Sequence, residues 1–282
     1  MERMIRLRRM TGDDVPLGMR LKDQAGWNQT EADWRRFLDL EPEGCFVAEL
    51  GGRPVGTTTT CVFDAVGWIA MVLVDEPARH QGIGTRLVSH ALEYLKCRGV
   101  RTVRLDATPL GRPVYERLGF AAEYGLARWQ GTAAGAAGDQ PVVDASPDRL
   151  DALAELDRHA TATDRRRFLA RLLEARPDDA RLVLAGEALL GYLMLRGGSL
   201  ATQVGPAVAV CPEAGRALAD WALGRCAGGP VFLDVPCDNA PATRWAASRG
   251  LTIQRRFTRM GRGRAIGDQP ACIWASSGPE KG

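Results

Sequence analysis

The stretch ARHQGIGTRLV, residues 78–88, is the most informative part of this sequence. It places Gly82 and Gly84 two positions apart, with Arg79 before them and an apolar helical pattern after them. Glycine accepts backbone angles closed to other residues and lets a ligand approach the main chain. The helix that follows leaves its first N–H groups unpaired and carries a partial positive charge. The pattern therefore predicts a cradle for a phosphate or pyrophosphate at the start of a helix.

Two well-known phosphate-binding loops fit this stretch poorly. A Walker A loop needs Lys followed by Ser or Thr after its last glycine, but here Thr85 and Arg86 follow. A Rossmann fingerprint needs a third glycine, where this chain has Leu87, and an early strand of a βαβ unit. A strand-to-helix turn without a ligand also fits the pattern taken alone, because glycine-rich turns are common.

The segments around this stretch predict a mixed α/β half. Alternating or continuous apolar runs indicate strands, and apolar residues at i, i+3 and i+4 indicate helices. The turn GGRP predicts a hairpin, and Gly99 is placed to end the long helix. The predicted strands are residues 4–10, 45–50, 54–63, 67–75 and 100–107, and the predicted helices are residues 31–40, 85–96 and 111–120.

Two motifs in register give residues 1–130 a resemblance to the GNAT acetyltransferase superfamily. The pyrophosphate loop of that family has the pattern Gln/Arg-x-x-Gly-x-Gly/Ala, which Arg79, Gly82 and Gly84 match. Residues 72–92 resemble its motif A from strand through helix, and YERLGF, residues 115–120, resembles its motif B. The resemblance implies a mixed, mostly antiparallel sheet that is splayed at the cofactor site and flanked by helices.

The resemblance also implies that the loop binds acetyl-CoA. The pantetheine arm would pair with the end of the central strand, and a backbone N–H there would polarise the thioester carbonyl. Thr108 stands where many relatives carry Asn. The implied cofactor-binding residues are Val72, Leu73, Val74, Arg79, His80, Gln81, Gly82, Ile83, Gly84, Thr85, Thr108 and Gly111.

Tyr115 occupies the position at which related enzymes place a general acid. A phenol with a pKa near ~10 can protonate the departing thiolate, although a packed aromatic residue on a short helix is the structural alternative. Asp106, at the end of its strand, is the candidate general base. Asp64, Glu49 and a chain of water molecules are the alternatives.

The resemblance implies that residues 25–34 line the acceptor pocket. Trp27 and Asn28 are therefore candidates for contact with the acceptor. Trp34 is in helical register and is predicted in the core, and Thr30 with Asp33 predicts a helix cap.

The second half repeats this order more weakly, which indicates a tandem duplication. Its hairpin, central strand, helix, strand and final helix are predicted at residues 180–197, 207–210, 213–226, 230–236 and 239–251. Only Gly215 remains of the glycine motif, Asn239 and Ala242 keep the spacing of motif B, and Ala246 falls where Tyr115 would lie. We expect a degenerate GNAT-like domain that does not turn over acetyl-CoA.

The Gly/Ala-rich segment GTAAGAAGDQP, residues 131–141, is predicted to be a linker. It separates a catalytic domain at residues 1–130 from a degenerate domain at residues 142–282.

Composition limits the class of protein. The chain has 282 residues and a net charge of +3, which does not suggest nucleic-acid binding. No apolar run approaches the ~20 residues of a membrane span, and the basic start lacks the apolar core of a signal peptide. We expect a cytoplasmic protein without nucleic-acid or membrane partners, as a monomer or a homodimer.

Cysteines and histidines give no sign of metal or disulfide chemistry. The seven cysteines are scattered without a C-x-x-C pair, which favours reduced thiols. The three histidines lack metal-ligand spacing, so no metal site is expected. Cys61 and Cys97 are predicted in the core, and RRR at residues 165–167 on the solvated face of a helix.

These observations predict an acetyl-CoA-dependent N-acetyltransferase. A primary amine, in the first place a small molecule, would attack the thioester directly in a ternary complex, although a protein N-terminus or lysine is also open. The alternatives are a non-catalytic acetyl-CoA-binding sensor and a transferase for a longer acyl group.

Overall fold

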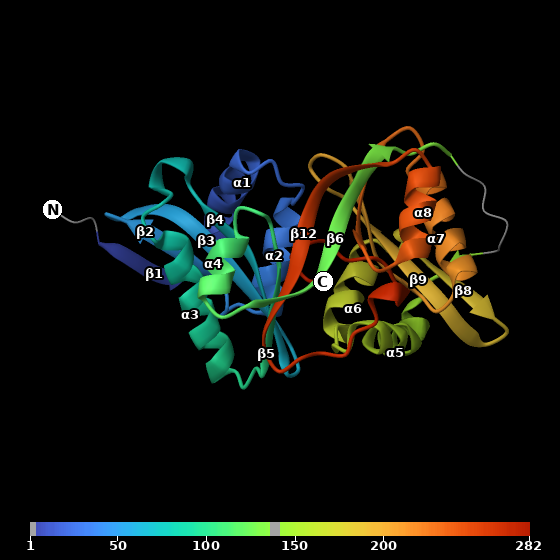
Figure 1. The fold of residues 1–282 in the computed structure, drawn as a ribbon, viewed down its shortest axis with the longest axis horizontal. Helices are drawn as coiled ribbons and strands as arrows, with labels where there is room; N and C mark the ends of the chain where they lie inside the picture. The colour runs from blue at the N-terminus through green and yellow to red at the C-terminus, as the bar shows by residue number, and fades with distance from the viewer. Residues whose placement is uncertain (1–3, 136–141) are drawn as a thin grey trace. The chain divides into compact units, whose positions relative to one another are not determined.

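The computed structural model describes residues 4–135 and 142–282, and the chain divides into two compact units (Figure 1). The first unit combines residues up to Ala122 with Met260–Ala265, and the second combines Glu123–Arg259 with Ile266–Glu280. Residues 136–141 of the predicted linker lie outside the described residues.

The first unit is built on a mostly antiparallel sheet, as predicted. Its strand order is β1-β2-β3-β4-β5, and the end of β12 follows β5. Neighbouring strands run antiparallel from β1 to β4, and β4 and β5 run parallel. The strands are β1 (Ile5–Arg9), β2 (Phe46–Leu50), β3 (Arg53–Phe63), β4 (Val66–Val74), β5 (Thr102–Ala107) and β12 (Thr252–Gly263). The helices are α1 (Val15–Gln24), α2 (Glu31–Leu40), α3 (Ile83–Cys97) and α4 (Arg112–Arg117).

Helix α3 has the apolar stripe and the ends that its sequence predicts. Leu87, Ala91 and Leu95 are fully buried in one core cluster with residues of the sheet. The helix begins after Gly82 and is followed by Gly99, whose φ of 76° fits the left-handed end of a helix. The start of α3 is therefore fixed against the sheet beside the end of β4.

The second unit repeats the architecture. Its strand order is β12-β6-β11-β10-β9-β8-β7, and β13 pairs with β10 off this path. The strands are β6 (Ala121–Thr132), β7 (Val143–Asp144), β8 (Ala180–Ala185), β9 (Ala188–Arg196), β10 (Thr202–Ala209), β11 (Pro230–Pro236) and β13 (Ile273–Ala275). The helices are α5 (Leu150–Thr161), α6 (Arg166–Ala175), α7 (Pro212–Arg225) and α8 (Ala240–Ser248).

The compact units do not follow the order of the sequence. Within the second unit, β6 pairs antiparallel with β11 from Leu126–Pro236 to Thr132–Pro230. Within the first unit, Met260 is fully buried in the core cluster of α3 and β5. The predicted limits of 1–130 and 142–282 remain predictions, while each unit takes a strand segment from the other half of the sequence.

Two predictions about single side chains are wrong. Cys97 ends α3 and is exposed rather than in the core, whereas Cys61 is buried as expected. Arg166 and Arg167 are exposed, but Arg165 is buried and forms an ion pair with Asp157. Among the described residues, no helix is long and apolar enough to cross a membrane.

Candidate cofactor and acceptor site

The glycine loop has the backbone geometry of an open cradle. Gly82 precedes α3 with φ of 78°, and His80 also has a positive φ of 63°. A methyl group at Gly82 would meet no atom within 4 Å, and one at Gly84 would meet only Val74, at 3.8 Å. The first N–H groups of α3, from Ile83 onward, have no acceptor within the helix. The main chain here is therefore open to an anionic ligand.

Arg79 has a structural task beside the loop. Its Nε donates to the Val74 carbonyl at 3.1 Å, and its Nη1 lies 3.4 Å from Glu76 Oε1. The side chain thus ties the end of β4 to the loop while remaining 34% exposed. His80 and Gln81 are exposed, and Thr85 is half-buried.

The sheet parts where the pantetheine arm was predicted. β4 pairs with β5 only through Val66, Gly67 and Trp68, which leaves Val72 and Leu73 without a parallel neighbour among the described strands. The register of β3 and β4 shifts between Thr57 and Thr59, so β4 bulges beside Val72.

Threonine hydroxyls hold the bulge. Met71 has a positive φ of 49°, which is unusual for a buried non-glycine residue. Thr57 Oγ1 donates to the Met71 carbonyl at 2.9 Å, and Thr58 Oγ1 donates to the Ala70 carbonyl at 3.4 Å. The surrounding β3 strand thereby fixes a strained stretch of β4 at the opening of the sheet.

Tyr115 lies on α4, half-buried, and its ring packs edge-on against Phe120 with centroids 6.0 Å apart. Burial raises the pKa of Tyr115 to about 12, so its hydroxyl keeps its proton at neutral pH. Thr108 Oγ1 accepts the N–H of Gly111 at 3.2 Å, and a methyl at Gly111 would lie 3.0 Å from the Tyr115 ring. Thr108 and Gly111 thus position the turn that carries Tyr115.

The candidate bases have different surroundings. Asp106 is half-buried near the end of β5. Glu49, on β2, accepts from Arg8 Nε at 2.7 Å, and Asp64 is exposed in the β3–β4 turn. Asp106 is therefore the candidate that lies on the parallel strand pair at which the sheet parts.

The segment between α1 and α2 contains the predicted acceptor residues. Asn28 is buried and Trp27 is half-buried. Trp34 is fully buried, as predicted, and its indole fills the space beside Gly18 of α1. Thr30 and Asp33 form the predicted capping box, in which the Thr30 N–H donates to Asp33 Oδ2 at 2.9 Å.

A polar cluster at the entrance to the loop was missed in the sequence. Asp75 is buried directly after β4 and accepts from Arg20 at 3.0 Å and from Gln24 at 3.0 Å. Burial alone would raise the pKa of Asp75, but these hydrogen bonds outweigh it and lower the pKa below its usual value. The cluster fixes α1 beside the loop, and it could not be predicted because α1 itself was not.

The sequence profile described as "Acetyltransferase (GNAT) family" matches residues 17–120, and that of an "Acetyltransferase (GNAT) domain" matches residues 153–274. An uncharacterised N-acetyltransferase of Methanocaldococcus jannaschii is 30% identical over 44% of this chain and 63% of its own length. An N-alpha-acetyltransferase of Arabidopsis thaliana is 34% identical over 38% of this chain and 60% of its own length. The matches thus span about 60% of these curated relatives.

A solved structure, a putative acetyltransferase from Pyrococcus horikoshii, shares the fold with a TM-score of 0.85 and 24% identity. The match covers 99% of this chain and 96% of that one. The fold and the open glycine loop define a tandem acyltransferase scaffold. With both halves matched, the chain belongs to the GNAT superfamily of acetyltransferases.

Proposed function

We propose that this protein is an acetyl-CoA-dependent N-acetyltransferase whose active site lies in the first unit and whose acceptor is a primary amine of a small molecule. The observation that carries the proposal is the open cradle at Gly82 and Gly84 beside a β4 strand that has parted from β5. A pyrophosphate fits this cradle, because neither glycine position is filled by another group and the first N–H groups of α3 lack acceptors.

Each element has a task in holding acetyl-CoA, which supplies the thioester that the amine attacks. The residues His80 to Thr85 present backbone N–H groups to the pyrophosphate. The pantetheine arm is proposed to lie along Val72, Leu73 and Val74, with which β5 forms no pairs, while the Val74 carbonyl accepts from Arg79 Nε. A backbone N–H of β4 beside the bulge at Met71 is proposed as the donor that a developing oxyanion needs.

Tyr115 is proposed to donate a proton to the leaving thiolate. Its raised pKa keeps the hydroxyl protonated at neutral pH, and no hydrogen bond to it is found among the described residues. Asp106 is proposed to receive the proton of the amine, directly or through water.

The acceptor is proposed to lie beside the α1–α2 segment, with Trp27 and Asn28 as its contacts. A polypeptide N-terminus is the second candidate acceptor, because one relative is named an N-alpha-acetyltransferase. A panel of small amines and of short peptides with a free N-terminus separates the two acceptor classes. Free thiol should be released with the small amines only if the acceptor is a small molecule, and with the peptides only if it is a polypeptide N-terminus.

The test uses Gly84→Asp. Gly84 has no positive φ and open space beside it, so the substitution leaves the backbone unstrained. A carboxylate in the first turn of a helix is itself favourable, and it would occupy the anion cradle. We expect unchanged thermal unfolding and a loss of coenzyme A affinity of roughly 10- to 100-fold, as losing one or more bonds to a charged group predicts.

Gly12→Asp is the matched control, because Gly12 also has open space and no positive φ. It should bind coenzyme A as the unchanged protein does. Equal coenzyme A affinity in all three proteins would refute the proposed cradle. A protein that binds acetyl-CoA but releases no thiol with any amine would instead be the sensor.

A further inference from the structure

The second unit has a counterpart of the cofactor site, and the two can be matched residue by residue. A methyl at Gly56 would meet the Leu73 carbonyl and Leu87, and one at Gly191 would meet the Val208 carbonyl and Leu218. These contacts place Val208 at the position of Leu73, and Leu218 at that of Leu87. Counting back along each helix then places Gly215 at the position of Gly84.

The parted sheet of the second unit is filled by the chain itself. β10 pairs in parallel with β11 only through Thr202, Gln203 and Val204, as β4 does with β5. Beyond that point β13 pairs antiparallel with β10 through Ala207 and Val208, the counterparts of Val72 and Leu73. On the other side, the Ser276 N–H donates to the Asp234 carbonyl of β11 at 2.8 Å. Residues 273–276 thus bond to both parted strands.

Trp274 fills the space beside the surviving glycine. A methyl at Gly215 would overlap the Trp274 indole, whereas one at Gly84 would meet only Val74, at 3.8 Å. Trp274 is 5% exposed, and its ring packs edge-on against Trp245 with centroids 6.4 Å apart. The room that the first unit leaves open beside its glycine is therefore taken by an indole.

Two further residues are shaped for this segment. Asn239, at the position of Thr108, caps α8 as Thr108 caps its turn, and its Nδ2 donates to the Ile273 carbonyl at 2.9 Å. Gly205 has φ of 128° in the bulge of β10, and a methyl there would overlap the Ser276 carbonyl. The Asn239 amide thus bonds to the main chain of residues 273–276, and Gly205 leaves room for it.

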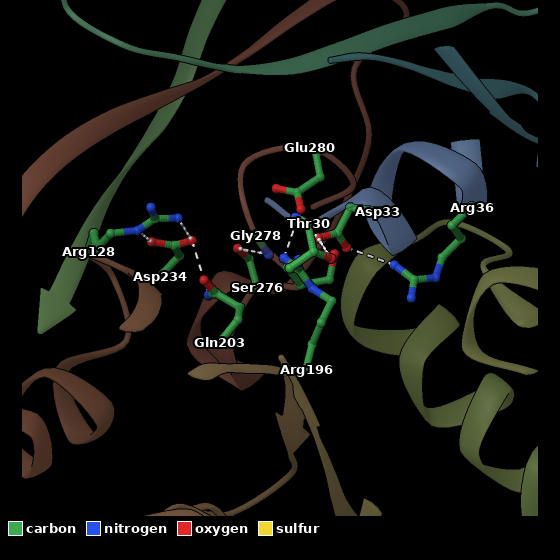
Figure 2. A network of polar contacts seen from close by, with 11 residues as sticks. Thr30, Asp33, Arg36, Arg128, Arg196, Gln203, Asp234, Ser276, Gly278 and Glu280 are labelled. Atoms are coloured by element: carbon green, nitrogen blue, oxygen red, sulfur yellow. Dashed lines mark hydrogen bonds and ion pairs between the residues drawn. The ribbon is translucent and has the colours of Figure 1, made fainter. Parts of the chain in front are cut away.

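Buried polar groups anchor the segment beyond β13. Arg196 of β9 donates to the Ser277 carbonyl at 3.0 Å and to Glu280 at 2.7 Å, and both charged side chains are buried. Figure 2 shows this pair together with the bidentate pair of Arg128 and Asp234. Removing either charge of the Arg196–Glu280 pair would leave the other buried without this ion pair, which is costly.

We propose that the second unit is a cleft for an extended peptide whose occupant is this chain's own segment 273–277, with Trp274 as its anchor. The segment occupies the place that pantetheine is proposed to take in the first unit. Coenzyme A therefore binds to the first unit alone, one molecule per chain. The occupied cleft goes beyond the proposed function, whereas the coenzyme A stoichiometry rests on it.

The first test compares Gly→Ala substitutions at the two matched glycines. Alanine is favoured over glycine within a helix, so Gly84→Ala should leave the urea midpoint unchanged or raise it. Gly215→Ala should lower the midpoint, because the methyl group displaces Trp274. In a Trp274→Ala background the same Gly215→Ala change should cost nothing further. An equal cost in both backgrounds would overturn the assignment of Trp274 to this cleft.

The second test asks whether the cleft behaves as a binding site. Trp274→Gly should lower the melting temperature, and added indole should restore part of the loss, since an apolar cavity of matching shape binds the missing ring. Gly82→Asp serves as the control, as indole should not raise its melting temperature. Absence of rescue in Trp274→Gly, with the fold retained by circular dichroism, would refute a cleft shaped for the indole.

Calorimetry tests the consequence for coenzyme A. We expect one site for the intact chain, and the same single site with roughly 10- to 100-fold lower affinity in Gly84→Asp. Two sites per chain, or a second site whose affinity Gly84→Asp leaves unchanged, would overturn the occupied cleft. No binding to the intact chain would instead refute the proposed function, while the Gly215 and Trp274 results would stand by themselves.

Discussion

Burial gives Tyr115 a property that its proposed role as a proton donor needs. Its ring packs on Phe120, and burial raises its pKa to about 12. The phenol therefore stays protonated whenever the enzyme is folded at neutral pH, which suits a donor and not a base. Giving up the proton is favourable only as negative charge develops beside the phenol, so in the proposed role Tyr115 would act late in the reaction.

Tyr115→Phe tests this role. The phenylalanine ring keeps the packing against Phe120, so melting temperature and coenzyme A affinity should hold. We expect kcat to fall by roughly 100-fold or more, the usual contribution of a positioned acid. Steady-state kinetics with calorimetry measure both, and an unchanged kcat would show that Tyr115 only packs.

The pH dependence gives a second prediction at this residue. Burial raises the pKa of Tyr115 from 10.0 to about 12, so the stability gained from a neutral Tyr115 is complete below pH 10. It is lost as pH rises toward 12. The rate should rise as the amine loses its proton and then stay level to about pH 11. A falling limb near pH 8–9 that vanishes in Tyr115→Phe would contradict the raised pKa.

Single residues also show what sequence patterns can resolve. The open main chain at Gly82 and Gly84 could be predicted, because the residue type glycine itself indicates it. A run of arginines usually lies on a solvated face, which predicts an exposed Arg165. Arg165 is instead buried, in an ion pair with Asp157. A side chain whose partner is distant in sequence leaves no local pattern.

At the scale of elements, helix ends carry clear local signals. The Thr30 side chain accepts the backbone N–H of Asp33, and the Asp33 side chain accepts that of Thr30. Asp33 also forms an ion pair with Arg36 at 2.8 Å. α2 could therefore be predicted with its exact start. In contrast, α1 begins at Val15, has Pro16 in its first turn and contains Gly18, which packs on the Trp34 indole. Its stability comes from that packing, so propensity alone did not reveal it.

Thr30→Ala tests the contribution of the cap. The substitution removes the hydroxyl that bonds Asp33 at 3.0 Å and should lower the free energy of unfolding by about 1 kcal/mol. Thr30→Ser, which keeps the hydroxyl, should retain most of it. Urea unfolding measures both, and equal losses for the two variants would show that the hydroxyl contributes nothing.

At the scale of the whole molecule, the sequence predicted the duplication but not the exchange of strand segments. The sequence predicts one domain in residues 1–130 and another in residues 142–282. Instead, β6 pairs with β11 in the second unit, and residues 260–265 belong to the first. A strand fits either sheet when both offer the same kind of edge, as duplicated halves do. Periodicity shows that a segment is a strand and leaves its neighbour undetermined.

The exchange predicts that a change near the end of the sequence destabilises the first unit. Gly263 has φ of 107°, and a methyl there would overlap the Arg101 carbonyl at the start of β5. Thr102 also donates to the Arg264 carbonyl at 2.6 Å, so this segment is fixed closely along β5. Gly263→Ala should therefore lower the stability of the first unit by about 1–3 kcal/mol.

Hydrogen exchange of the β5 amides measures this effect, with Gly267→Ala as the control, because Gly267 has no positive φ and nothing within 4 Å. We expect faster exchange along β5 in Gly263→Ala and no change in the control. Because β5 flanks the opening of the sheet, coenzyme A affinity should fall together with protection. Unchanged exchange in β5 would mean that residues 260–265 do not stabilise the first unit, and that residues 1–130 hold their sheet without them.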